Sequence, residues 1–203
     1  MLRQPRGGRN SRRLGPAASF RRRAPLASIP RPFSRGGAPL RRLDDPESAL
    51  ERTLILLKPD AVHRGLIGHV LARFEAKGLK LVGLKMRQFP VELIREHYAV
   101  HAERPFYASL VGFMTSGPVV AIALEGNKAI EVARNLIGAT DSKKAAPGTI
   151  RGDLGMSFSN NLVHGSDGPE SAAKELALFF PDAEEICEWT PVGDPWVYSD
   201  EER

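Results

Sequence analysis

Cysteine is almost missing from this 203-residue chain, in which Cys187 is the only one. A single cysteine excludes an internal disulfide and a zinc site built on several cysteines. No apolar stretch approaches the roughly 18–20 residues that a membrane-spanning helix needs. The glycine-rich patterns GxxxxGK[ST] and GxGxxG are also absent, so neither a P-loop nor a Rossmann phosphate cradle is expected.

Acidic residues are absent from residues 1–43, which contain 12 arginines, six prolines and no lysine. Such a segment cannot bury enough apolar surface to offset its ordering entropy, so we predict that residues 1–50 form a disordered, Arg/Pro/Gly-rich extension. The 160 residues after position 43 hold the other 17 of the 29 basic residues and all 24 acidic ones, a net charge of −7. The basicity therefore belongs to the extension, and nucleic-acid binding by the acidic body is not expected.

Three interpretations of the extension stay open. It is a solvated tail or the result of a wrongly assigned start, an organelle transit peptide, or an arm for nucleic acid or anionic lipid. Its prolines weaken the second interpretation, because a transit peptide usually forms an amphipathic helix. We expect a cytoplasmic protein, or a mitochondrial or plastid one if residues 1–43 are a transit peptide.

Apolar periodicity predicts four strands and five helices in the body, residues 51–203. The predicted strands are 53–57, 79–86, 118–124 and 158–163, and the predicted helices are 67–74, 91–99, 104–114, 129–137 and 169–180. Residues 139–157 are predicted to be a long loop. This order contains the split βαβ pattern of a ferredoxin-like α+β sandwich, with a four-stranded antiparallel sheet and helices packed on one face.

The segment Asn161-Leu162-Val163-His164-Gly165-Ser166-Asp167 is the strongest functional candidate. His164 ends an apolar run just before a helix start, so it can project toward a ligand, although a lone histidine is more often merely packed or exposed. An imidazole with an ordinary pKa of about 6.5 is largely neutral and nucleophilic near pH 7. Glu175, two turns into the following helix, could orient the ring, and Asp167 with Glu170 resembles a capping box.

Basic residues elsewhere could bind an anionic substrate. Lys58 ends the first predicted strand, Arg134 lies on a helix, and glycines at 148 and 152 flank Arg151 closely enough to suggest a backbone shaped to aim it. His97 and His101 have the i, i+4 spacing of metal ligands, but no third ligand is evident nearby. We therefore expect them to lie on a helix surface or to be partly buried.

Taken together, these stretches resemble the nucleoside diphosphate kinases. The resemblance covers residues 50–200 and rests on ERTLILLKPDAV, RGLIG, HYAVHAERPFY, TSGPVVAIALEG, GATD, AAPGTIRGD and NLVHGSDGPESAAKE. The last two motifs are highly specific, and their order and separation also fit. One departure is Phe158, where family members often carry a smaller aliphatic residue.

The resemblance implies a ping-pong phosphotransferase that moves the γ-phosphate of a nucleoside triphosphate, mainly ATP, to nucleoside diphosphates. His164 matches the histidine that is phosphorylated, and Ser166 and Glu175 match the pair that positions it. The residues matching the phosphate- and nucleotide-binding positions are Lys58, Tyr98, Phe106, Arg134, Thr140, Arg151 and Asn161. Among them Phe106 matches the aromatic that stacks on the base, and Asn161 the amide that bonds the ribose.

The resemblance also implies Mg²⁺ held mainly by the nucleotide phosphates, with no metal ligand from the protein, and a homo-oligomer that is a tetramer or a hexamer. Two other hypotheses remain. One is a nucleotide-sensing protein that binds nucleic acid through its basic N-terminal extension, and the other is an interaction protein with a vestigial site.

Overall fold

A computed structural model of the chain describes residues 50–199, so the predicted extension over residues 1–50 lies almost entirely outside the described residues. The described elements, in chain order, are β1 (Glu51–Leu57), α1 (Pro59–His63), α2 (Ile67–Ala76), β2 (Lys80–Arg87), α3 (Val91–His97), η1 (Ala99–His101), α4 (Tyr107–Met114), β3 (Val119–Gly126), α5 (Ala129–Ile137), α6 (Ile150–Leu154), β4 (Val163–Gly165), α7 (Pro169–Phe179), η2 (Ala183–Glu185) and α8 (Asp194–Val197).

The four strands form one antiparallel sheet in the order β2-β3-β1-β4. The fully buried run of β3 and the buried second half of β1 make these two strands the centre of the sheet. The short β4 pairs with the last residues of β1, where Leu56 lies opposite His164. This arrangement confirms the predicted four-stranded α+β fold.

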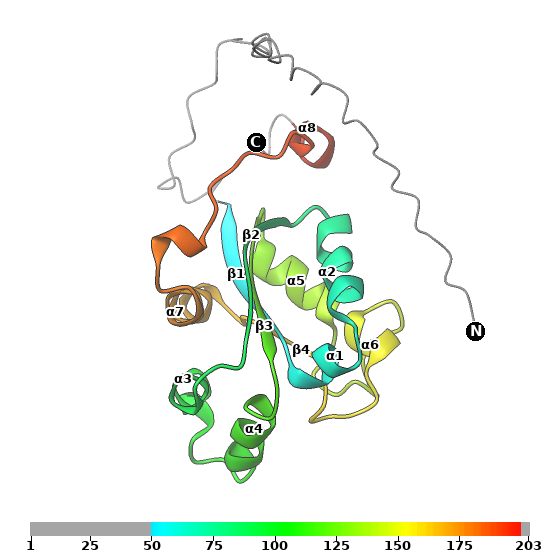
Figure 1. Ribbon diagram of the computed structural model, residues 1–203. Coiled ribbons are helices and arrows are strands. Elements are labelled where there is room, and N and C mark those ends of the chain that lie inside the picture. Colours follow the sequence, from blue (N-terminus) through cyan, green and yellow to red (C-terminus); the bar gives the residue numbers. More distant parts are fainter. Residues whose placement is uncertain (1–49, 200–203) are drawn as a thin grey trace, which may run out of the picture. The chain divides into compact units, whose positions relative to one another are not determined.

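Helices cover both faces of the sheet, so the prediction that they lie on one face is wrong. Side chains alternate along a strand, and Ile55 and Leu57 of β1 therefore enter one core while Leu54 and Leu56 enter another. The first core contains side chains of α2 and α5, and the second contains side chains of α3, α4 and α7. Figure 1 shows α2 and α5 on one side of β1 and α7 on the other.

Three local predictions near residues 161–167 need correction. The last strand is Val163–Gly165 rather than 158–163, because residues 158–160 make bends outside the sheet. The predicted loop 139–157 contains the helix α6. Helix α7 starts after Gly168, and the Gly168 backbone N–H donates to Ser171 Oγ at 3.0 Å, so Asp167 and Glu170 do not form the predicted capping box.

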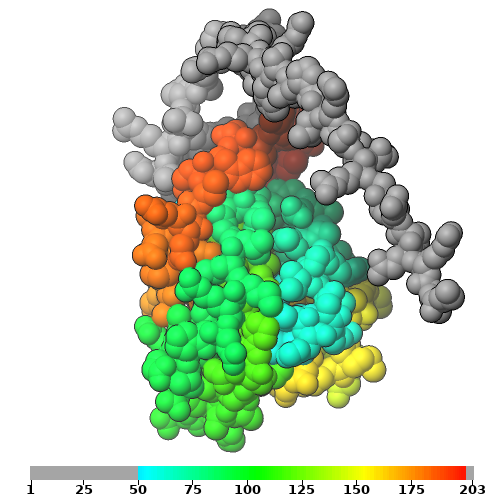
Figure 2. Space-filling view, viewed as in Figure 1, coloured from blue at the N-terminus to red at the C-terminus, as the bar shows by residue number. Residues whose placement is uncertain are grey.

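The segment after α7 packs along the edge strand β2 of its own chain. The backbone N–H of Cys187 donates to the Val82 carbonyl at 2.7 Å, and Trp189 Nε1 donates to the Leu81 carbonyl at 2.9 Å. Figure 2 shows this orange segment lying directly against the green part of the surface. Part of the backbone edge of β2 is therefore already paired within the chain. Within residues 50–199, we find no helix that is long and apolar enough to span a membrane.

Candidate active site

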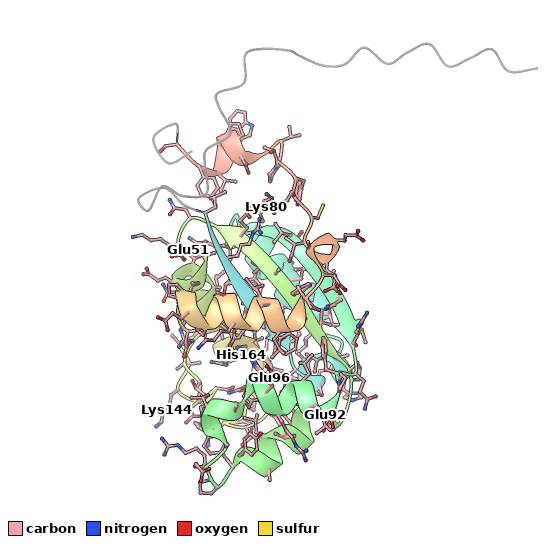
Figure 3. The ribbon with its side chains drawn as sticks, turned by 90° about the vertical axis from the view of Figure 1, so that its left-hand side faces the viewer. Glu51, Lys80, Glu92, Glu96, Lys144 and His164 are labelled. Atoms are coloured by element: carbon pink, nitrogen blue, oxygen red, sulfur yellow. The ribbon has the colours of Figure 1, made fainter. Side chains whose placement is uncertain are left out.

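His164 lies in the middle of β4, not beyond a strand end as predicted. Gly165 follows it in close contact with α5, since a Cβ there would come within 2.7 Å of Ile137 Cδ1. The side chain of His164 is 22% exposed and faces a cleft of about 1360 Å³. Figure 3 shows the residue between α7 and α3, the helix that carries the labelled Glu92 and Glu96. A sheet strand thus holds the backbone of His164 while leaving its ring accessible.

Two neighbours hold the imidazole ring of His164 in one orientation. Its Nε2 donates to Glu175 Oε1 at 2.9 Å, and Ser166 Oγ donates to the other carboxylate oxygen at 2.6 Å. Ser166 in turn accepts from the backbone N–H of Leu54 at 3.1 Å. Because a carboxylate only accepts hydrogen bonds, Nε2 carries the ring proton and Nδ1 keeps a lone pair. The sequence prediction paired these three side chains, and the structure brings them together.

Lys58 is a buried cation that directly follows the last residue of β1. Its Nζ donates to Asn161 Oδ1 at 2.7 Å, and Asn161 Nδ2 donates to the Thr140 carbonyl at 2.9 Å. Burial first, and then the charge of Arg151, lower the pKa of Lys58 to about 8 against the opposing effect of Asp60. At pH 7 the ammonium group is still charged, although it has only a neutral amide as its hydrogen-bond partner.

Arg151 is the second buried cation, and it comes from α6. Its guanidinium donates to three backbone carbonyls, those of Asn161, Gly138 and Val163, at 3.1, 3.0 and 2.6 Å. Burial, followed by the charge of Arg134, lowers its pKa to about 10, so it stays charged. Gly152 is required beside it, because a Cβ there would lie 2.0 Å from the Ala146 carbonyl oxygen. The glycine signal in the sequence was therefore a good guide to a shaped backbone.

The other predicted binding residues make fewer contacts with β4 and its neighbours than Lys58 and Arg151 do. Arg134 is exposed and its Nη1 lies 3.4 Å from the Gly165 carbonyl. Tyr98 is buried with its ring centroid 6.3 Å from that of His164, and burial raises the pKa of its hydroxyl. Phe106 is 49% exposed, Thr140 is exposed, and Phe158 is 60% exposed. The role of Phe158 in base binding stays a prediction.

Sequence reasoning missed two backbone features beside His164. Leu162, with a φ of 69°, adopts a left-handed conformation that costs a non-glycine residue about 1 kcal/mol or more. Its N–H donates to Asp60 Oδ2 at 3.1 Å, and its carbonyl accepts from the Lys58 N–H at 2.8 Å. Asp60, which directly follows Lys58-Pro59, thereby ties the start of β4 to the end of β1. In the sequence, only the position of Asp60 just after a predicted strand could have indicated this link.

His97 was predicted to lie on a helix surface or to be partly buried, and its side chain is only 1% exposed. Its ring packs edge-to-face against His164, with centroids 4.7 Å apart. The spacing to His101 does not make a metal pair, because α3 ends at His97 and His101 belongs to η1. His97 instead lies close to residues of other elements, His164 on β4 and Glu175 on α7.

The site combines the oriented ring of His164 with cations that have no carboxylate partner. Among the side chains that the structure describes, neither Lys58, Arg134 nor Arg151 forms an ion pair within 4.0 Å. A buried charge without a counterion is costly. The arrangement is therefore suited to receive an anionic group next to His164.

Comparison with known proteins agrees with a site that binds an anionic substrate. The profile of the family described as nucleoside diphosphate kinase matches residues 51–185. The chain is 55% identical over 148 residues to a nucleoside diphosphate kinase of Microcystis aeruginosa, covering 73% of this chain and 99% of that protein. It is 50% identical to one of Archaeoglobus fulgidus, with 74% and 99% covered.

Solved structures are similar as well. A halophilic nucleoside diphosphate kinase from Halobacterium salinarum, solved in complex with CDP, superposes with a TM-score of 0.72 at 49% identity, covering 74% of this chain and 99% of that one. A family protein from Babesia bovis gives a TM-score of 0.71 at 44% identity, with 73% and 99% covered. The chain belongs to the nucleoside diphosphate kinase family and is a phosphotransferase that acts on nucleotides.

Proposed function

We propose that this enzyme transfers the γ-phosphate of a nucleoside triphosphate, mainly ATP, to a nucleoside diphosphate through a phosphohistidine on His164. The observation that carries the proposal is the orientation of the ring. Glu175 accepts the Nε2 proton of His164 in a 2.9 Å hydrogen bond, which leaves the lone pair on Nδ1 for attack. A reaction in two half-steps through one site follows, because the same nucleophile serves donor and acceptor in turn.

In the first half-step, Nδ1 forms a bond to the γ-phosphorus as the bond to the β–γ bridging oxygen breaks. The electron pair of that bond leaves with the nucleoside diphosphate. No proton needs to leave the ring, since Nδ1 is unprotonated and Nε2 keeps its hydrogen. The phosphorylated ring gains positive charge, which the carboxylate of Glu175 offsets across the existing hydrogen bond. The second half-step is the reverse reaction with a different diphosphate.

Cations supply most of the remaining catalytic effect, because phosphoryl transfer depends on positioning and charge stabilisation. Lys58, Arg134 and Arg151 are the proposed phosphate ligands, with Thr140 and Tyr98 at the same end of the nucleotide. Arg151 already donates to three carbonyls, so its contribution is mainly the field of a fixed charge. Lys58 has more freedom, since among the described residues its Nζ donates only to the amide oxygen of Asn161.

Enzymes of this family generally use a divalent metal ion, and we propose Mg²⁺ carried mainly by the nucleotide phosphates. Mg²⁺ prefers oxygen ligands and retains several waters. The one cluster of three potential metal-ligating side chains in residues 50–199 contains two histidines, so it does not suit this ion. The carboxylates nearby are engaged, with Asp60 bonded to Leu162 and Glu175 to the nucleophile. Mg²⁺ would neutralise phosphate charge that otherwise repels the nucleophile.

The nucleoside part would lie against Phe106. Stacking uses the π-face that every base has, so it discriminates little between bases. The relative from Halobacterium salinarum was solved with CDP, which supports a nucleoside diphosphate as the ligand. Asn161 is the proposed ribose contact, and its amide would have to share Oδ1 with Lys58 and loosen its bond to the Thr140 carbonyl.

A pulse–chase experiment tests the proposal. Enzyme labelled with [γ-³²P]ATP is separated from nucleotide and then given GDP. We expect an acid-labile, base-stable label that passes quantitatively to GTP. His164→Asn should carry no label, whereas His69→Asn, which changes an exposed histidine on α2, should label normally. Transfer that requires both nucleotides at once, with no isolable phosphoenzyme, would refute the two-step mechanism.

Two broader properties are also proposals. Assembly into a tetramer or a hexamer is expected from the family, and light scattering of the purified chain distinguishes the two. A cytoplasmic location is expected from the acidic, disulfide-free body, with a mitochondrion or plastid as the alternative if residues 1–43 are removed as a transit peptide. Sequencing the N-terminus of the native protein decides between these locations.

A further inference from the structure

His97 is the side chain beside the nucleophile that the proposed reaction leaves without a role. It is 1% exposed, and neither of its ring nitrogens has a hydrogen-bond partner among the described residues. Burial, followed by the effects of the neighbouring His164, Lys58 and His101, lowers its pKa to about 2. The ring is therefore neutral and keeps one unused lone pair. An unsatisfied buried polar group costs about 1–3 kcal/mol, so a ligand that binds it would relieve a real penalty.

Three potential metal ligands converge at this point from separate elements. One ligand atom from each of His97, His164 and Glu175 lies within 4.8 Å of the other two. His164 Nε2 and His97 Nδ1 lie 2.9 and 3.8 Å from the same carboxylate oxygen, Glu175 Oε1. These residues come from α3, β4 and α7, and Figure 3 shows His164 in the space between the two helices.

We propose that His97, His164 and Glu175 form a binding site for a transition-metal dication such as Zn²⁺, and that occupancy of this site inhibits the enzyme. Two imidazoles and one carboxylate are a ligand set typical of zinc, with the fourth tetrahedral position left to water. The three ligand atoms, now within 4.8 Å of one another, would move closer together by side-chain rotation to lie about 2.0–2.2 Å from a common ion.

An ion can reach the site from the cleft in front of His164. The cleft is lined by His97, His101, His164 and Glu175, and the last two are 22% and 14% exposed. The ion would meet His164 and Glu175 first, and His97 would complete the set from beneath. The positive charge of Lys58 acts on His97 and opposes a cation, so binding should be weaker than at a dedicated structural zinc site.

Inhibition follows from the tautomer, and this part of the inference rests on the proposed function. A metal ion needs the Nε2 lone pair of His164, so the ring proton must move through solvent from Nε2 to Nδ1. The nitrogen proposed to attack the γ-phosphorus then has a hydrogen and no lone pair. Mg²⁺ would not have this effect at physiological concentrations, because it prefers oxygen ligands. The site would thus make the enzyme sensitive to imidazole-binding metals while it works with Mg²⁺.

Cobalt substitution tests the site without using activity. We expect one Co²⁺ per chain of the nucleotide-free protein, with the intense visible absorption of tetrahedral coordination, displaced by Zn²⁺ and unaffected by excess Mg²⁺. His97→Phe keeps the ring packing and removes one ligand, so it should weaken Co²⁺ binding at least about tenfold. The matched control His101→Phe changes the other histidine of the same cleft and should bind like the wild type.

The outcomes separate this inference from the proposed function. Weak octahedral absorption in the wild type, or equal Co²⁺ affinity in the wild type and His97→Phe, would overturn the metal site. Zn²⁺ should reduce phosphoenzyme formation in the wild type at concentrations at least about tenfold lower than in His97→Phe. Phosphoenzyme formation by both proteins without Zn²⁺ tests the proposed function by itself, and thermal denaturation checks that His97→Phe is folded.

Discussion

Basic side chains that are at least partly buried lie near both ends of strand β1, but only those at one end pair with a carboxylate. At the start of the strand, Arg52 and Lys80 bond the same carboxylate, Glu125, at 2.7 and 2.8 Å. At its other end, Lys58 and Arg151 have amide and carbonyl oxygens instead. Figure 3 shows Lys80 well away from His164, so the two groups are distinct.

The pKa shifts at the two ends express this difference. Burial opposes ionisation of Glu125, but its bonds to Lys80 and Arg52 outweigh burial and lower its pKa. At the other end, burial dominates and lowers the pKa of Lys58 to about 8. The charges of Arg52 and Lys80 are balanced by Glu125 and contribute to stability. The charges of Lys58 and Arg151 have no counterion among the described residues until an anion binds. Unpaired buried cations are thus a more specific sign of function than charge clusters in general.

The sharpest test of this comparison replaces one lysine at each end with methionine. Lys58→Met should lower kcat/KM by about 10²–10³, the effect of removing a single electrostatic donor. Lys80→Met should leave kcat/KM within about twofold, because its positive charge acts on Glu125 and not on the nucleotide. Steady-state kinetics with ATP and a diphosphate acceptor measures both. Similar losses in the two variants would mean that the distinction between the ends is wrong.

Glu175→Gln should have the next largest effect, a decrease of about 10–100-fold in the rate of phosphoenzyme formation. Glutamine keeps the side-chain length, but its amide can also donate, so the Nε2–H tautomer is no longer enforced and the phosphorylated ring loses its counter-charge. Rapid-quench measurement of labelled enzyme gives the rate. Ser171→Ala, on the same helix but bonded to the helix start, is the matched control and should react normally. An unchanged rate in Glu175→Gln would contradict the assigned role.

The pH dependence of kcat/KM should show the lowered pKa of Lys58. The proposed mechanism needs the charged lysine, and the free enzyme loses that charge above about pH 8. We expect kcat/KM to fall by up to about tenfold per pH unit above pH 8. Lys58→Arg, whose guanidinium stays charged, should lack this decrease even if its maximum is lower. A wild-type profile that is flat to pH 10 would show that Lys58 either is not shifted or is not needed.

Removing a charge should change the stability of the protein in opposite directions at the two ends of β1. The folded pKa of Lys58 lies below its unfolded value of 10.5, so its charge opposes folding below about pH 8 and this penalty disappears as pH approaches 10.5. At pH 7, Lys58→Met should therefore raise the free energy of unfolding by about 1–3 kcal/mol. The loss of the hydrogen bond to Asn161 reduces this gain. Glu125→Gln should lower it by about 1–2 kcal/mol. Urea denaturation at pH 7 measures both, and a destabilised Lys58→Met variant would oppose the account.

Much of the fold followed from apolar patterns, and the errors have physical causes. The runs of β1 and β3 predicted central strands because a fully buried strand is continuously apolar. The sequence could not show that Leu54 and Ile55 enter different cores, since the burial of both faces hides the alternation. Strand β4 was misplaced because Phe158 has strand propensity, whereas the turn through Leu162 and its bond to Asp60 decide where pairing starts.

At the site, the residues with a motif were easier to predict than those without. His164, Ser166 and Glu175 lie within one short segment, so local spacing indicated their contact. Lys58 and Asn161 are 103 positions apart, and only the resemblance to a family linked them. Nothing in the spacing of His97 and His101 pointed to His164, because that contact depends on how α3 packs across the sheet. Long-range packing is what the sequence alone could not supply.

Mass-spectrometric mapping of the phosphoenzyme is the most direct test of the central claim that His164, next to unpaired cations, accepts the γ-phosphoryl group. The full chain is incubated with ATP and Mg²⁺ without an acceptor, digested at alkaline pH and fragmented by electron transfer. The account predicts one phosphoryl group on the peptide containing His164, and its loss on adding GDP. A phosphoryl group on another residue, or equal occupancy in His164→Asn, would contradict it.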